Sequence, residues 1–156
     1  MSVTIDEFDR KILHHLQIDA SLPAETIGER IGLSRNACWR RIKRLEDAGV
    51  IAARVALLDP DKLNLGLTVF IAVRTRSHSA EWLEQFKQAT RSIPEITGVF
   101  RMSGETDYLL RASVPSMAEY DALYQRLISK VELTDVSSSF VMEEIKDTTE
   151  LPLGYL

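Results

Sequence analysis

Cysteine, proline and glycine are scarce in this chain, and each scarcity excludes a class of protein. The 156 residues include a single cysteine, Cys38, so no internal disulfide can form and a reducing compartment is indicated. Five prolines and seven glycines are too few for a linker-rich or fibrous chain. We therefore expect a folded protein made of one ordinary domain or of two small ones.

Long apolar runs are also lacking. The longest, such as residues 69–73, are far too short to cross a bilayer. Charged residues interrupt the first ten positions, so the start does not have the basic and apolar regions of a secretory signal. These features predict a cytoplasmic protein with no membrane partner.

The net charge of −4 is unevenly distributed along the chain. Residues 20–45 contain six basic and two acidic side chains, a local charge of +4, whereas residues from 50 onward contain eleven basic and fifteen acidic ones, a charge of −4. Five cations fall between positions 35 and 44 with no acid among them. A basic segment on an otherwise acidic protein is typical of a phosphate-binding surface. The alternative is a solvated charged face without a partner.

Apolar spacing predicts three short helices in the first fifty residues, over 6–17, 23–31 and 34–48. Ser34 is a good N-cap for the third helix, and Gly32 can end the second in a left-handed conformation. Three helices with a tight Gly-Leu-Ser turn before a basic third helix predict a helix-turn-helix. Cys38 shares the inner stripe of the third helix with Ile42 and Leu45, which favours a buried small hydrophobe over a redox sensor.

The second half of the chain changes character. After a strand over 50–58 we expect strands at 67–75, 96–103, 108–114 and 136–146, with helices at 79–92 and 116–130. This order is the ferredoxin-like βαββαβ arrangement. The predicted fold class is α+β: a helix-turn-helix domain of the winged type at 1–50, a linker strand and hinge at 51–66, and a ferredoxin-like domain at 67–156. Because one face of its sheet lacks helices, a second copy of the chain is the expected cover.

Short motifs along nearly the whole chain follow the order and spacing of one family. They are residues 5–13 (IDEFDRKIL), 32–34 (GLS), 38–46 (CWRRIKRLE), 49–51 (GVI), 56–60 (ALLDP), 104–108 (GETDY) and 141–144 (VMEE). In these motifs the chain resembles the leucine-responsive regulatory protein and asparagine regulator (Lrp/AsnC, feast-famine) family. Residues 57–68 and 137–151 more particularly resemble its DecR-like branch. The resemblance implies a sequence-specific transcription regulator that binds double-stranded DNA. It also implies homodimers that assemble into higher oligomers such as octamers, and a response to a small amino acid.

The outer face of the third helix holds the candidate DNA contacts. Asn36 and Arg40 are assigned to base edges, because an Arg fork suits the paired acceptors of guanine and Asn suits adenine. The candidate phosphate contacts are Ser34, Arg35, Lys43 and Arg44. Trp39 is a further candidate that packs either on DNA or on the linker or partner chain, and Arg41 is a candidate for holding the three helices together. A nucleoid-structuring protein with low sequence specificity is the alternative function.

For the effector, the resemblance implies a site near the turn at 104–107, between neighbouring dimers. An amino acid carries both an ammonium and a carboxylate, so its site needs an acceptor and donors together. Asp107 is the candidate partner of the ammonium, and backbone N–H groups with nearby hydroxyls are candidates for the carboxylate. The full set of candidate residues is Met102, Gly104, Glu105, Asp107, Tyr108, Met117, Ser137, Ser138, Ser139 and Phe140. The alternative is a hairpin turn without a ligand, and the three serines favour a small or polar effector.

No metal or cofactor other than the amino-acid effector is predicted. The three histidines, His14, His15 and His78, have no Cys, Asp or Glu at metal-ligand spacing. Ferredoxin-like dimers also host small oxygenases, but no activated nucleophile, metal cluster or cofactor loop is visible in the sequence. We therefore expect no enzymatic activity.

Overall fold

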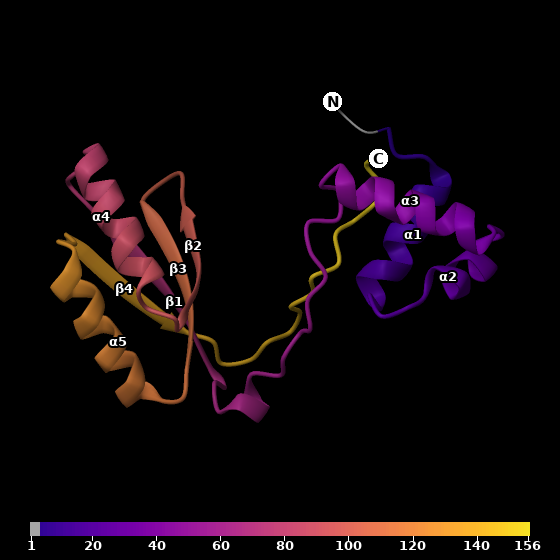
Figure 1. Cartoon of the computed structure of the whole chain (residues 1–156). Coiled ribbons are helices and arrows are strands. Elements are labelled where there is room, and N and C mark those ends of the chain that lie inside the picture. The colour runs from indigo at the N-terminus through magenta and orange to yellow at the C-terminus, as the bar shows by residue number, and fades with distance from the viewer. Residues whose placement is uncertain (1–3) are drawn as a thin grey trace. The chain divides into compact units, whose positions relative to one another are not determined.

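The structure, a computed structural model, describes residues 4–156 and divides them into two compact units (Figure 1). One unit contains the chain up to residue 57 together with residues 146–156, and the other contains residues 58–145. Residues 1–3, which the expected domain at 1–50 includes, lie outside the described residues. No helix among residues 4–156 is both long and apolar enough to pass through a membrane.

Three helices form the first unit, as the apolar spacing predicts. They are α1 (Glu7–Ile18), α2 (Ala24–Ile31) and α3 (Arg35–Asp47). Each helix contributes fully buried side chains to one shared core, in which the central residues are Ile12, Ile27, Cys38 and Leu45. The amphipathic pattern of the sequence is thus satisfied within this unit, and the predicted helix-turn-helix is confirmed.

The turn between α2 and α3 depends on two glycines. Gly32 ends α2 with a φ of 77°, in the left-handed region that favours glycine. At Gly28 an added Cβ would lie 2.6 Å from the carbonyl oxygen of Leu33, so a larger residue would displace the backbone of the turn. Ser34 then begins α3 by accepting the backbone N–H of Ala37. These features set the angle at which α3 leaves the bundle.

The C-terminal tail also belongs to the first unit. The Gln17 side chain on α1 donates to the carbonyl oxygen of Leu151 at 3.2 Å and accepts the N–H of Leu151 at 2.6 Å. Leu153 packs against the three-helix core. Residues 146–156 are therefore grouped with the helices, although the expected sheet domain at 67–156 includes them.

The second unit is a four-stranded antiparallel sheet with two helices. Its elements are β1 (Leu67–Arg74), α4 (Ala80–Arg91), β2 (Ile96–Arg101), β3 (Tyr108–Val114), α5 (Met117–Lys130) and β4 (Asp135–Phe140). The strand order is β2-β3-β1-β4, with both neighbours of β1 antiparallel to it. The predicted βαββαβ arrangement is confirmed.

Two expected strands differ from the structure. The described residues 48–66 contain no strand, only a short 3-10 turn at Asp61–Leu63, so neither the strand over 50–58 nor a wing is formed. A strand needs a hydrogen-bonded neighbour, and the single chain supplies none there. The last strand ends at Phe140 rather than at 146, because its partner β1 begins at Leu67 and the ladder stops after Val141 bonds to Thr68.

The two faces of the sheet are different. Val69, Ile71 and Val73 of β1 are fully buried against α4 and α5, which lie on the same side of the sheet (Figure 1). Their neighbours Phe70 and Ala72 point to the other side, because side chains alternate along a strand. The cross-strand pairs place further residues on this side, which we call the open face: Phe70, Ala72, Phe100, Leu109, Arg111, Ser137 and Ser139.

Candidate nucleic-acid interface and effector site

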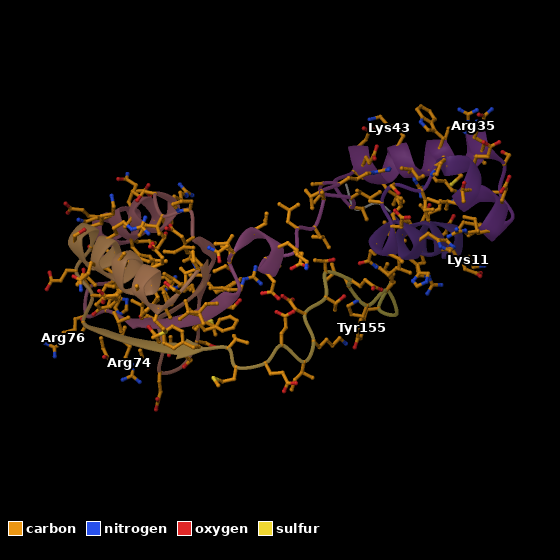
Figure 2. The ribbon with its side chains drawn as sticks, turned by 90° about the horizontal axis from the view of Figure 1, so that it is seen from below. Lys11, Arg35, Lys43, Arg74, Arg76 and Tyr155 are labelled. Atoms are coloured by element: carbon orange, nitrogen blue, oxygen red, sulfur yellow. The ribbon has the colours of Figure 1, made fainter. Side chains whose placement is uncertain are left out.

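All seven predicted DNA contacts are exposed along α3 and its N-cap. They are Ser34, Arg35, Asn36, Trp39, Arg40, Lys43 and Arg44. Arg35 and Lys43 project from α3 on the side away from Lys11 of α1 (Figure 2). Trp39 is 58% exposed, which is unusual for an indole that has no partner. The helix therefore presents a basic surface that contains an exposed aromatic ring. We call this surface, which the seven residues form together, the α3 face.

At the edge of α3 that contacts α1, Arg41 is fixed by Asp9 of α1 and by Asp6, the N-cap of that helix. Its Nη1 donates to Asp6 Oδ2 at 2.7 Å and to Asp9 Oδ1 at 2.9 Å, and its guanidinium carbon lies 5.5 Å from the centre of the Phe8 ring. These bonds to Asp6 and Asp9 raise the pKa of Arg41. The pKa of Asp6 is lowered, first because its carboxylate accepts the backbone N–H of Asp9 and then by the bond from Arg41. Arg41 therefore joins α3 to α1, the role that the sequence suggested.

The most deeply buried acid of the first unit is Asp9. Its side chain is 0% exposed and also accepts a hydrogen bond from Arg44. Sequence reasoning missed this group, although its position three residues before Ile12 and seven before Leu16 places it on the buried stripe of α1. An acid on an apolar stripe signals a buried ion pair, because an unpaired buried charge is very costly.

Cys38 is fully buried in the three-helix core, and burial raises the pKa of its thiol. A thiol with a raised pKa forms little thiolate, which is the reactive species. The expectation of a small core hydrophobe agrees with both observations.

The turn that was predicted to bind an effector joins β2 to β3. Gly104 has a φ of 106°, which requires glycine. Asp107 is half-buried, and its Oδ2 accepts the backbone N–H of Thr75 at 2.8 Å. Glu105 is almost fully exposed, and one of its carboxylate oxygens lies 3.3 Å from Arg74 Nη2. One oxygen of Asp107 thus stabilises the end of β1, and the other is one of the carboxylate acceptors that this turn offers to a ligand.

The other effector candidates do not all converge on this turn within one chain. Tyr108 is buried against α4, with its ring centre 4.7 Å from that of Phe86. The three serines alternate between faces: Ser137 and Ser139 lie on the open face, whereas Ser138 bonds to Tyr120 of α5. They cannot act together on one carboxylate within this chain.

Met117 and Phe140 lie at the other end of the sheet from the turn. The register pairs Tyr108 with Val73 beside the turn and Val114 with Leu67 at the far end, six residues or about 20 Å along β3. Met117 begins α5 just after Val114, and Phe140 pairs with Val69. The candidate set is therefore spread along the sheet: residues 104–108 lie at one end, Met117 and Phe140 lie toward the other, and the three serines lie between them.

Comparison with known proteins covers both units. Residues 5–46 match the family model described as "AsnC-type helix-turn-helix domain", and residues 68–151 match the "Lrp/AsnC ligand binding domain". The DNA-binding transcriptional activator DecR of Escherichia coli is 47% identical over 150 residues, which cover 96% of this chain and 99% of that protein.

Solved structures agree over nearly the full length. An AsnC family transcriptional regulator from Agrobacterium tumefaciens has a TM-score of 0.94 and 54% identity, covering 97% of this chain and 99% of that one. A transcriptional regulator from Neisseria meningitidis was solved as a complex with L-methionine. It has a TM-score of 0.93 and 42% identity, covering 97% of this chain and 99% of that one. Both family models and the two solved structures agree with the helix-turn-helix and the βαββαβ unit described above. The chain therefore belongs to the Lrp/AsnC family and is a DNA-binding transcription regulator.

Proposed function

We propose that the α3 face reads operator DNA in the cytoplasm and that a small amino acid, bound beside the 104–107 turn, controls assembly or DNA pose. The observation that carries this proposal is the exposure of Asn36 and Arg40 along α3, flanked by the exposed side chains of Ser34, Arg35 and Lys43. Recognition helices place the residues of their N-terminal turns at base edges in the major groove. Asn36 and Arg40 are exposed in the N-terminal half of α3, so they are the base contacts of the proposal.

Phosphate contacts supply affinity without sequence information. Ser34, Arg35 and Lys43 are assigned to them because they flank the base-reading residues on the α3 face. Lys43 is bound to Asp47 at 2.9 Å, but both side chains are more than half exposed, so the pair is weak and easily exchanged for a phosphate. This arrangement predicts different effects for base and phosphate contacts.

Replacing Arg40 by alanine is expected to cost about 1–3 kcal/mol of binding free energy at the cognate operator and to relax the preference for one base pair. Replacing Lys43 by alanine is expected to weaken all duplexes alike and to make the slope of log affinity against log salt shallower by about one unit. Mobility-shift titrations at several salt concentrations, on operator and scrambled duplexes, measure both quantities.

Lys11→Ala is the matched control for Lys43→Ala. Lys11 forms the same kind of i,i+4 ion pair, to Glu7 at 2.8 Å, but projects away from the α3 face (Figure 2). The slope of log affinity against log salt for Lys11→Ala should equal that of the wild type. If both α3 variants bind like wild type, the α3 face does not bind DNA. If Arg40→Ala weakens operator and scrambled duplexes equally, the low-specificity alternative is favoured.

An amino acid is the proposed effector because the Neisseria relative holds L-methionine and the turn offers an acceptor for an ammonium group. Asp107 has one carboxylate oxygen bonded to Thr75, which leaves the other for the ligand. Because Met117 and Phe140 lie at the far end of the sheet, we assign them to the side of the site that a neighbouring copy supplies. This placement fits a site between dimers, where ligand binding and assembly are coupled.

The open face is the proposed dimer interface. Phe70 and Leu109 lie on the two central strands of this face, and Phe100 beside them is 49% exposed. An apolar sheet face without helices is normally covered by another layer. Phe70→Lys is expected to convert a dimer or larger assembly into a monomer, since burying an unpaired ammonium is costly.

Multi-angle light scattering at micromolar concentration measures this change. Glu84→Lys, on the exposed side of α4, is the matched control and should keep the assembly of the wild type. A monodisperse wild-type monomer would refute the interface and would weaken the case for an effector site between dimers.

A further inference from the structure

The five cations of α3 are held unequally by acids of the same chain. Among residues 4–156, no ion pair involves Arg35 or Arg40. Lys43 pairs with Asp47, which is solvated, whereas Arg44 pairs with the buried Asp9. The sequence assigns Lys43 and Arg44 alike to phosphates, but the structure separates Lys43, whose acidic partner is solvated, from Arg44, whose acidic partner is buried.

Asp9 needs the arginines that contact it. Its carboxylate is 0% exposed, and Oδ1 accepts Arg41 Nη1 at 2.9 Å. Its Oδ2 accepts the backbone N–H of Asp6 at 3.0 Å and the Nη2 of Arg44. If Arg44 turned to a phosphate, Oδ2 would keep only one neutral donor inside the unit. A buried carboxylate that loses an ionic partner is strongly destabilised, whereas Asp47 would simply be hydrated when Lys43 leaves it.

We propose that Asp9 is a positioning residue that withholds Arg44 from DNA. Although Arg44 is exposed on the α3 face, it stays bound to Asp9 in the complex and neutralises no phosphate. This inference rests on the proposed DNA-binding role of the α3 face. Its consequence is that α3 contributes fewer phosphate contacts than its charge suggests, which lowers sequence-independent affinity and leaves a larger share of binding to Asn36 and Arg40.

The test is the salt dependence of binding to a scrambled duplex between 50 and 200 mM salt. Arg44→Ala should keep the wild-type slope, while Lys43→Ala becomes shallower by about one unit. Asp9→Asn removes the charge but keeps the shape, so Arg44 is released and the slope should become steeper by about one unit, an additional loss of about 3.5-fold over this fourfold rise in salt. Combining Asp9→Asn with Arg44→Ala should restore the wild-type slope.

A purely structural role for Asp9 predicts lower stability with an unchanged slope. The proposal is overturned if the salt slope of Arg44→Ala is as shallow as that of Lys43→Ala, or if Asp9→Asn has the same salt slope as the wild type. It is also overturned if adding Arg44→Ala to Asp9→Asn does not return the steeper slope to the wild-type value. Far-UV circular dichroism shows whether Asp9→Asn and Arg44→Ala are folded. If one of them is not, the double variant replaces it: its slope equals the wild-type slope if Arg44 neutralises no phosphate, and it is shallower by about one unit if Arg44 does. If neither Lys43→Ala nor Arg40→Ala affects binding, the α3 face does not bind DNA, and both the proposed function and this inference fail.

Discussion

Replacing Arg41 by methionine is expected to lower the free energy of unfolding by about 3 kcal/mol. Methionine keeps the aliphatic part of the side chain beside Phe8, but it removes the donor to Asp6 and Asp9. Asp9 is fully buried, so the lost bond is not replaced by water. The cost comes mainly from this under-compensated carboxylate rather than from the loss of an attraction at the surface.

Urea denaturation measures the change, and hydrogen exchange locates it. Protection should fall in α1 and α3 and stay unchanged in β1 and β3, which belong to the other unit. Lys43→Met is the matched control, because it breaks an exposed i,i+4 pair on the same helix and should cost no more than about 0.5 kcal/mol. Equal costs for the two variants would show that the Asp6, Asp9 and Arg41 cluster contributes no more than a surface pair. Replacing Asp9 by leucine together with Arg41→Met should cost less than Arg41→Met alone.

The helical unit could be predicted closely because its signals are local. Ser34 caps α3 and Gly32 ends α2, and each acts within one turn of its own position. The missing strand at 50–58 and the early end of β4 at Phe140 depend instead on a neighbouring strand, which local sequence does not reveal. The position of the tail is non-local as well, since Leu151 contacts Gln17 over a separation of 134 residues.

The DNA-binding face was more predictable than the effector site, because the first depends on local sequence and the second on contacts between distant segments. The α3 face follows from helical periodicity, so its exposed residues could be named without coordinates. The effector set combined residues from several strands and could not be checked without the register of β1, β3 and β4. One part of that set could have been corrected from the sequence: three consecutive serines in a strand alternate between faces, so Ser138 is separated from Ser137 and Ser139.

The charge of Asp107 is expected to control effector binding. Asp107→Asn should keep the fold, because the amide oxygen of asparagine can still accept the N–H of Thr75, and because turns tolerate Asn nearly as well as Asp. The change removes the anion that, in the proposed site, pairs with the ammonium of the amino acid. Binding should weaken by about 2–5 kcal/mol, the usual cost of leaving a buried charge without its partner.

A thermal-shift screen of the common amino acids, beginning with L-methionine, selects the ligand, since a ligand of the native state raises its stability. Calorimetric titration of that ligand then compares wild type with Asp107→Asn. Glu84→Gln is the matched control: it removes an exposed carboxylate of α4 that lies outside the candidate site, so its affinity should equal that of the wild type. A residue that only shapes the turn predicts the opposite pattern, with a small loss of stability and an unaltered ligand response. Equal affinities for wild type and Asp107→Asn would therefore limit Asp107 to its bond with Thr75.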